Sequence, residues 1–181
     1  VPLVVGDIVL EIQRKTLEKP EIYLGLETEV RISEQIPIGE STGVDVPGQL
    51  WKRYHMEKAS IEANLNTTVE MGMSHTEGTS QNLFTYFAGG LVQNIPDRLQ
   101  DGFVKRELSA GEYIVCRVEA ENFEDLVTVA LDQASKYLFG IWLPRHNLTT
   151  EPFSAEKYYR DSEGMACMEI WVKPLPLENK C

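Results

Sequence analysis

Two glutamates near the end of the chain each share a strand face with a large aromatic residue. Glu156 and Tyr158 are two residues apart, and Glu169 and Trp171 have the same spacing. Side chains two apart in a β-strand point to the same face. If the two segments pair as a hairpin, both carboxylates and both rings line one surface. Such a surface could bind an organic cation, and a carboxyl with a raised pKa there could act as a general acid or base.

Further aromatic residues could supply the walls of the same site. A simpler interpretation applies to each, because a single strand glutamate is usually solvated and helical Trp or Tyr at core spacing usually belongs to the core. Composition and periodicity alone therefore support only an α+β domain. The additional candidates for ligand binding are Trp51, Tyr54, Tyr86, Tyr113 and Trp142.

The sequence lacks the motifs of several common enzyme classes. His55, His75 and His146 are far apart and have no second His or Cys at a ligand spacing, so we expect no metal site. G-x-S-x-G, P-loop and G-x-G-x-x-G motifs are absent. We therefore expect no cofactor and no catalytic triad, and a binding protein is favoured over an enzyme.

Charge and composition limit the partners. The 181 residues are 43% hydrophobic, which is enough for one domain with its own core, and the net charge is −11. An acidic surface repels phosphate, so we expect no direct nucleic acid contact and no binding to anionic membranes. No apolar run reaches the roughly 18 residues of a membrane helix. Three cysteines without a close pair indicate free thiols and a cytoplasmic protein.

Apolar periodicity predicts two helices among short strands. Asp45 and Pro47 are start signals for a first helix of about 17 residues that reaches Leu65. Asn122 can cap a second helix, whose apolar stripe runs from Phe123 to Ile141 and which Pro144 ends. Residues 36–43 read as a loop. The predicted strands are 8–13, 22–26, 67–74, 83–93, 103–108, 113–118, 153–159 and 167–172.

The order of these elements predicts a duplicated domain. Each half reads strand, helix, strand, strand, over about 8–95 and about 102–174, within a single domain of residues 1–181. We expect an α+β fold of two β-α-β-β units, in which antiparallel sheets form a barrel-like groove with two helices. A central cleft between two such halves is a common place for a ligand.

Six segments resemble, in order, those of the GyrI-like, AraC/XylS-type effector-binding domains. They are LWKRY (50–54), FTYFAG (84–89), LSAGEYIV (108–115), WLP (142–144), PFSAEKY (152–158) and EIWVKP (169–174). The resemblance implies two pseudo-symmetric units around an apolar and aromatic pocket that holds an acidic residue. Such pockets bind hydrophobic, often cationic, compounds. By this resemblance Glu156 is the pocket acid, Glu169 a second acid, and Tyr158 and Trp171 are walls.

The resemblance leaves three functions open. The first is the effector-binding module of a bacterial transcription regulator, covalently linked to a helix-turn-helix domain for which this chain has no room, or a stand-alone relative. The second is a GyrI-like hydrolase of electrophilic small molecules that uses the same glutamate. The third is a gyrase-inhibitor-like protein that binds another protein.

Overall fold

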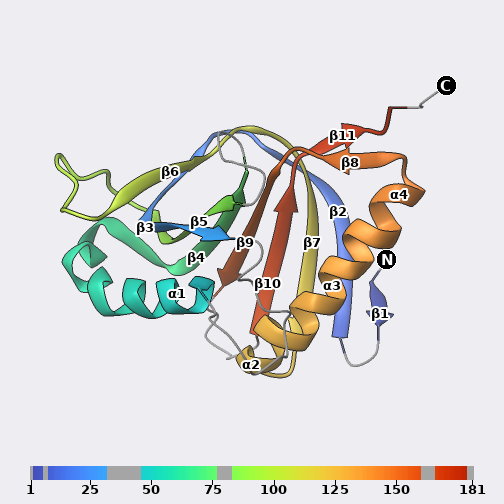
Figure 1. Cartoon of the computed structure of the whole chain (residues 1–181), viewed down its shortest axis with the longest axis horizontal. Coiled ribbons are helices and arrows are strands. Elements are labelled where there is room, and N and C mark those ends of the chain that lie inside the picture. Colours follow the sequence, from blue (N-terminus) through green and yellow to red (C-terminus); the bar gives the residue numbers. More distant parts are fainter. Residues whose placement is uncertain (1, 6–7, 32–45, 77–82, 160–165, 179–181) are drawn as a thin grey trace.

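One antiparallel sheet organises the chain in the computed structural model (Figure 1), which describes residues 2–5, 8–31, 46–76, 83–159 and 166–178. Within these ranges the strand order is β1-β2-β7-β10-β9-β4-β5-β3-β6, and β8 and β11 form a separate pair. The α+β class is confirmed, but the described strands form an open sheet with β1 and β6 at its edges. The bounds are β1 Leu3–Val5, β2 Ile8–Leu17, β3 Glu21–Arg31, β4 Leu65–His75, β5 Leu83–Val92, β6 Val104–Leu108, β7 Gly111–Ala120, β8 Leu148–Thr150, β9 Phe153–Tyr159, β10 Ala166–Val172 and β11 Pro174–Pro176.

The first helix is shorter than predicted. Helix α1 spans Val46–Glu57, with Pro47 in its first turn, and two 3-10 turns follow at Lys58–Ser60 and Glu62–Asn64. Ile61 is buried between these turns and Leu65 is buried at the start of β4, so two residues of the predicted stripe reach the core outside α1. The predicted cap Asp45 and the predicted loop 36–43 lie outside the described residues.

The second helix begins as predicted and ends later. The Asn122 side chain accepts a hydrogen bond from the Asp125 amide at 2.8 Å. The helix then winds through α2 Phe123–Asp125, the π-helical segments Leu126–Ala130 and Leu138–Trp142 around α3 Leu131–Tyr137, and α4 Leu143–Arg145. Pro144 does not end it, because the winding continues through α4 as far as Arg145.

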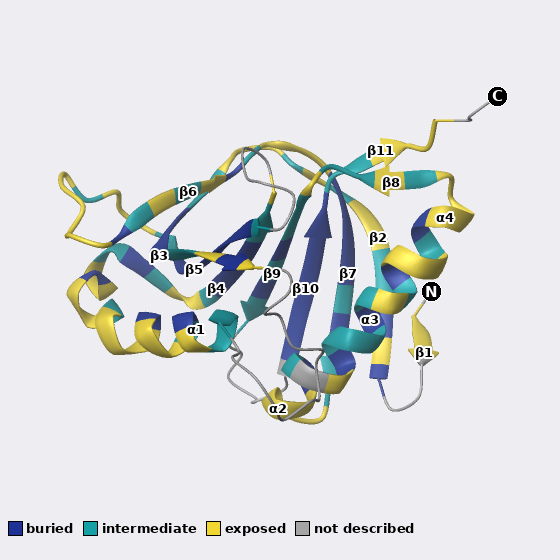
Figure 2. Ribbon diagram, in the orientation of Figure 1, coloured by how far each residue is buried: buried dark blue, intermediate teal, exposed yellow. Residues whose placement is uncertain are grey.

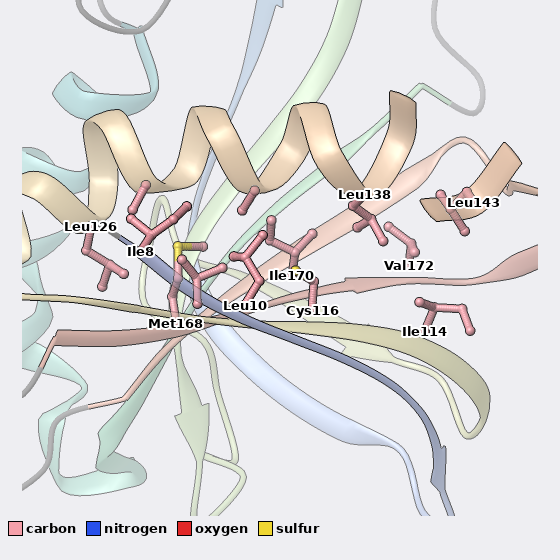
Figure 3. Close-up of a cluster of buried hydrophobic side chains, with 13 residues drawn as sticks. Ile8, Leu10, Ile114, Cys116, Leu126, Leu138, Leu143, Met168, Ile170 and Val172 are labelled. Atoms are coloured by element: carbon pink, nitrogen blue, oxygen red, sulfur yellow. The ribbon is translucent and has the colours of Figure 1, made fainter. Parts of the chain in front are cut away.

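Both helices lie against the same face of the sheet, with β9 and β10 between them (Figure 1). The second helix covers a core in which Leu126, Ala130 and Leu138 pack on Ile170 and Cys116 (Figure 3). A separate core lies under α1. We call the side of the sheet that carries both helices the helix face.

The opposite side of the sheet, which we call the helix-free face, carries a third core whose buried residues all come from strands. Tyr23, Phe87, Tyr113 and Trp171 are the largest of its members, contributed by strands β3, β5, β7 and β10. Figure 2 shows that the central strands are buried while the outer surfaces of α1 and α3 are exposed. Both helices therefore lie on the helix face. The duplication of a β-α-β-β unit stays a prediction.

Candidate functional site

Glu156 lies in the middle of the helix face, between the two helix cores. Directly opposite it are Ile170 on β10 and Gly72 on β4. Ile170 belongs to the core under the second helix, whereas Ala88, opposite Gly72 on its other side, belongs to the core under α1. A partly buried carboxylate thus occupies the position where the two apolar cores meet.

The absent side chain of Gly72 makes room beside Glu156. A Cβ atom at Gly72 would lie 2.3 Å from the Tyr86 hydroxyl and 3.6 Å from Glu156 Oε2. The Trp51 indole N–H donates to the same Tyr86 hydroxyl at 2.9 Å. Gly72 therefore allows an aromatic hydroxyl from β5, held by a tryptophan on α1, to approach the carboxylate.

Tyr158 completes the surroundings of the carboxylate. Its hydroxyl donates a hydrogen bond of 2.6 Å to Glu156 Oε2. The Tyr158 ring contacts Trp51 edge-on, with centroids 5.8 Å apart and planes at 87°. The central site therefore comprises Trp51, Gly72, Tyr86, Glu156 and Tyr158, and we refer to it below by that name.

The electrostatics of the central site disfavour a free negative charge. Burial raises the pKa of Glu156, and the hydrogen bond from Tyr158 opposes this only in part. Burial, and then the neighbouring Glu156 carboxylate, raise the pKa of Tyr158, so its hydroxyl stays a donor. Within the described part of the chain, no Lys, Arg or His forms an ion pair with Glu156. Among the residues that the structure describes, the Tyr158 hydroxyl is therefore the group that supports the Glu156 carboxylate.

A model of one protein family covers nearly the whole chain. The GyrI-like small molecule binding domain matches residues 12–173. The chain belongs to this GyrI-like family. The resemblance read from the six sequence segments is confirmed, and small-molecule binding is the general property of the domain.

Solved structures share the fold of this GyrI-like domain at low sequence identity. An integron cassette protein from the mobile metagenome of Vibrio cholerae has a TM-score of 0.63 and 14% identity, with 92% of this chain and 95% of that chain covered. SAV2435 bound to tetraphenylphosphonium has a TM-score of 0.64 and 16% identity, with 91% and 94% covered. The EcmrR C-terminal domain has a TM-score of 0.57 and 13% identity, with 93% and 99% covered. No curated protein matches the sequence.

Glu169 does not line the same surface as Glu156, which corrects an expectation from the sequence. Strands β9 and β10 do pair, but Glu169 lies opposite Lys157, and Ile170 lies opposite Glu156. Glu169 is only 2% exposed on the helix-free face. Residues directly opposite each other on paired strands point to the same face. Glu169 therefore shares a face with Lys157, and Glu156, which is next to Lys157 in the strand, points to the other face.

Glu169 is held by groups of the protein itself. It accepts hydrogen bonds from the Tyr159 hydroxyl at 2.6 Å, from Lys15 Nζ at 3.2 Å and from the Trp171 indole N–H at 3.2 Å. Burial alone would raise the pKa of Glu169, but these three donors and the charge of Lys15 outweigh it and lower the pKa. This pattern is that of a structural carboxylate.

Trp171 already contacts a cation from the same chain. Lys157 Nζ lies 3.6 Å from the centre of the Trp171 ring and 2.6 Å from Glu21 Oε1. Tyr113 also packs against Trp171, with ring centroids 5.2 Å apart, and it donates its hydroxyl proton to the Ser109 carbonyl. The cation–aromatic–carboxylate arrangement expected for a ligand thus exists on this face with Lys157 as the cation.

The remaining predicted residues lie near or outside the central site. Tyr54 is 1% exposed and packs edge-on against Trp51 at 5.8 Å, so it supports the site from behind. Trp142 lies near the end of the second helix and stacks on His146, with centroids 3.9 Å apart. Of the nine residues predicted for ligand binding, the structure gathers Trp51, Tyr86, Glu156 and Tyr158 in one place.

The sequence analysis missed one residue of the central site and misplaced a second residue that lies beside it. Gly72 has no side chain to suggest a role, and only the register that places it beside Glu156 reveals one. Phe123 was assigned to the buried stripe of the second helix, but it is 62% exposed and its ring centre lies 6.2 Å from that of Tyr158. Ile141, assigned to the same stripe, is also exposed at 40%. Both residues lie at the ends of the predicted stripe, whose middle residues Leu126, Ala130, Ala134 and Leu138 are buried.

The described residues show neither a cluster of metal ligands nor a membrane-spanning helix. Among the described residues, no group of three or more His, Cys, Asp or Glu side chains could hold a metal ion. None of the helices described is both long and apolar enough to cross a membrane.

Proposed function

We propose that this GyrI-like domain binds lipophilic organic cations at the central site, with Glu156 as their counter-ion. The observation that carries the proposal is a carboxylate on the helix face with a hydroxyl donor and aromatic neighbours but no basic partner among the described residues. SAV2435, with the same fold, has been solved bound to tetraphenylphosphonium, a cation of this class.

The energetics favour charge selection with loose shape selection. An unpaired carboxylate among apolar groups costs several kcal/mol to desolvate. A ligand cation removes that cost, so one residue selects for positive charge. Each contact between the cation and an aromatic face adds about 0.5–2 kcal/mol, and flat rings accept ligands of many shapes.

We further propose that ligand binding serves transcription regulation, with this domain as the effector-binding module of a bacterial regulator or as a stand-alone relative. The fold is also that of the EcmrR C-terminal domain, and EcmrR has been solved in complex with DNA. The net charge of −11 supports a division of labour in which this chain contacts the ligand and another domain contacts DNA.

Calorimetric titration with tetraphenylphosphonium tests the role of Glu156. We expect Glu156→Gln to weaken binding about 30-fold, because the substitution removes about 2 kcal/mol of charge pairing. Glu107→Gln is the matched control, since Glu107 is exposed on edge strand β6 and its loss changes the net charge equally. Equal affinity of the wild type and Glu156→Gln, or an equal loss in both variants, would refute the proposal.

A further inference from the structure

Phe123 is an exposed aromatic residue at the margin of the central site. It is the first residue of α2 and is 62% exposed, although its ring centre lies 6.2 Å from that of Tyr158 at an angle of 58°. Its backbone is fixed, because the Asn122 side chain caps this turn. The chain thus holds a phenyl ring in water, next to the tyrosine that donates to Glu156.

Trp51 contacts the same tyrosine from the other helix. The ring centres of Trp51 and Tyr158 are 5.8 Å apart, with the planes at 87°. Tyr158 therefore has an aromatic neighbour from each helix, one partly buried on α1 and one exposed on α2. The rings differ in one respect that matters for a ligand: Trp51 is tied to Tyr86 by a hydrogen bond, whereas Phe123 offers an uncovered face.

We infer that Phe123 is the outer aromatic wall of the central site, and that it makes the domain prefer cations bearing aryl rings over cations of equal charge bearing alkyl chains. This inference rests on the proposed function and adds the residue that sets the ligand class. Glu156 would select ligands by their positive charge, and Phe123 would select them by their aryl groups.

The physical basis is the difference between ring–ring and ring–alkyl contacts. An aryl group laid against Phe123 buries its exposed face and gains the edge-to-face or offset-stacked attraction between aromatic rings. An alkyl chain gains only the burial. Removing the phenyl ring should therefore cost an aryl cation more than an alkyl cation, while removing the charge of Glu156 should weaken both to a similar degree.

Tetraphenylphosphonium and tetrabutylphosphonium form a matched pair for this test, since they carry the same charged centre with different arms. We would titrate both by calorimetry into the wild type, Phe123→Ala and Phe123→Leu. Leucine keeps an apolar side chain without the ring. Phe139→Ala is the control, because Phe139 is 42% exposed on the same helix but sixteen residues further along, roughly 20 Å away.

The expected result is a ring-specific loss. Phe123→Ala and Phe123→Leu should each weaken tetraphenylphosphonium binding by about 3- to 10-fold. They should change tetrabutylphosphonium binding by less than about 2-fold, and Phe139→Ala should change neither. Because Phe123 is exposed, both variants should keep the thermal unfolding midpoint of the wild type within about 2 °C.

Other outcomes overturn the inference in distinguishable ways. Unchanged tetraphenylphosphonium binding in Phe123→Ala, or an equal loss for both cations, removes Phe123 from the site while leaving the role of Glu156 intact. If the wild type binds neither cation, or Glu156→Gln binds both as well as the wild type, the proposed function fails and the inference fails with it.

Discussion

Glu156 and Glu169 lie on adjacent strands of one sheet, yet their carboxylates have opposite electrostatic surroundings. Glu169 accepts three hydrogen bonds, including one from the ammonium of Lys15, and its pKa is lowered although burial acts to raise it. Glu156 accepts one from Tyr158, and its pKa is raised by burial. The described residues therefore supply Glu169 with three donors, one of them a cation, and supply Glu156 with one hydroxyl donor.

This contrast predicts that removing the charge of Glu156 stabilises the free protein at neutral pH. The pKa of Glu156 in the folded protein lies above that of an unfolded glutamate, about 4.3, so ionisation costs stability as the pH rises from the unfolded pKa through the folded pKa. We expect Glu156→Gln to raise the free energy of unfolding by roughly 1 kcal/mol at pH 7. At pH 3 the carboxyl is protonated in both states, and the difference should vanish.

Urea denaturation of the wild type and Glu156→Gln at the two pH values provides the measurement. The glutamine amide oxygen can still accept the Tyr158 hydroxyl, so the comparison isolates the charge. A variant that is less stable than the wild type at pH 7 would show that the carboxylate is satisfied in the free protein.

At the scale of elements, the helix-free face is held together by charges that connect several strands. Lys15 on β2 and Tyr159 on β9 both reach Glu169 on β10, and Lys157 on β9 reaches Glu21 on β3. Strands β9 and β3 are separated in the sheet by β4 and β5, so this last contact requires strong curvature of the sheet. The network therefore fixes the strand that carries Glu156.

We expect Glu169→Gln to destabilise the fold by about 3 kcal/mol, since it removes the negative charge beside Lys15 and replaces one of the two acceptor oxygens by an amide group that cannot accept. Glu112→Gln is the control, because Glu112 pairs with Arg14 in an ion pair in which each side chain is 53% exposed, and such pairs contribute at most about 1 kcal/mol. The stabilisation by Glu169 is present above the unfolded pKa and is lost as the pH falls through the lowered folded pKa. Denaturation curves at pH 7 and pH 3 should show the gap shrinking in acid. An equal loss for both variants would contradict a buried network.

The elements themselves were largely predictable from the sequence, and their pairing register was not. Alternation predicted the strand 153–159 at its observed bounds and placed Glu156 and Tyr158 on one face. Nothing local indicates that Ile170, rather than Glu169, lies opposite Glu156, because that depends on contacts between distant strands. The continuation of the second helix past Pro144 was likewise not predictable, since π-helical segments have no clear sequence signal.

At the scale of the whole molecule, the central site joins two otherwise separate cores. The core under α1 and the core under the second helix meet at Glu156, and the rings of Trp51 and Phe123 reach Tyr158 from the two helices. A ligand in contact with both rings would connect both helices. Its binding free energy would then add to the stability of the entire domain rather than to one half.

We expect tetraphenylphosphonium to raise the unfolding temperature of the wild type in one cooperative transition. At a concentration 100 times the Kd, the added stability is about 2.7 kcal/mol, which corresponds to roughly 5–10 °C for a chain of this size. Glu156→Gln at the same ligand concentration should show a much smaller shift. Differential scanning calorimetry is the measurement. A shift confined to one of two separate transitions would contradict the expectation.

The most direct test of the account is the ionisation of Glu156, followed by carboxyl ¹³C NMR in protein with labelled glutamate and assigned by comparison with Glu156→Gln. We predict a pKa above the ordinary glutamate value in the free protein and a clear fall when tetraphenylphosphonium is bound, because the cation stabilises the carboxylate. An ordinary pKa in the free protein that the ligand leaves unchanged would contradict the claim that this carboxylate is kept for a positively charged partner.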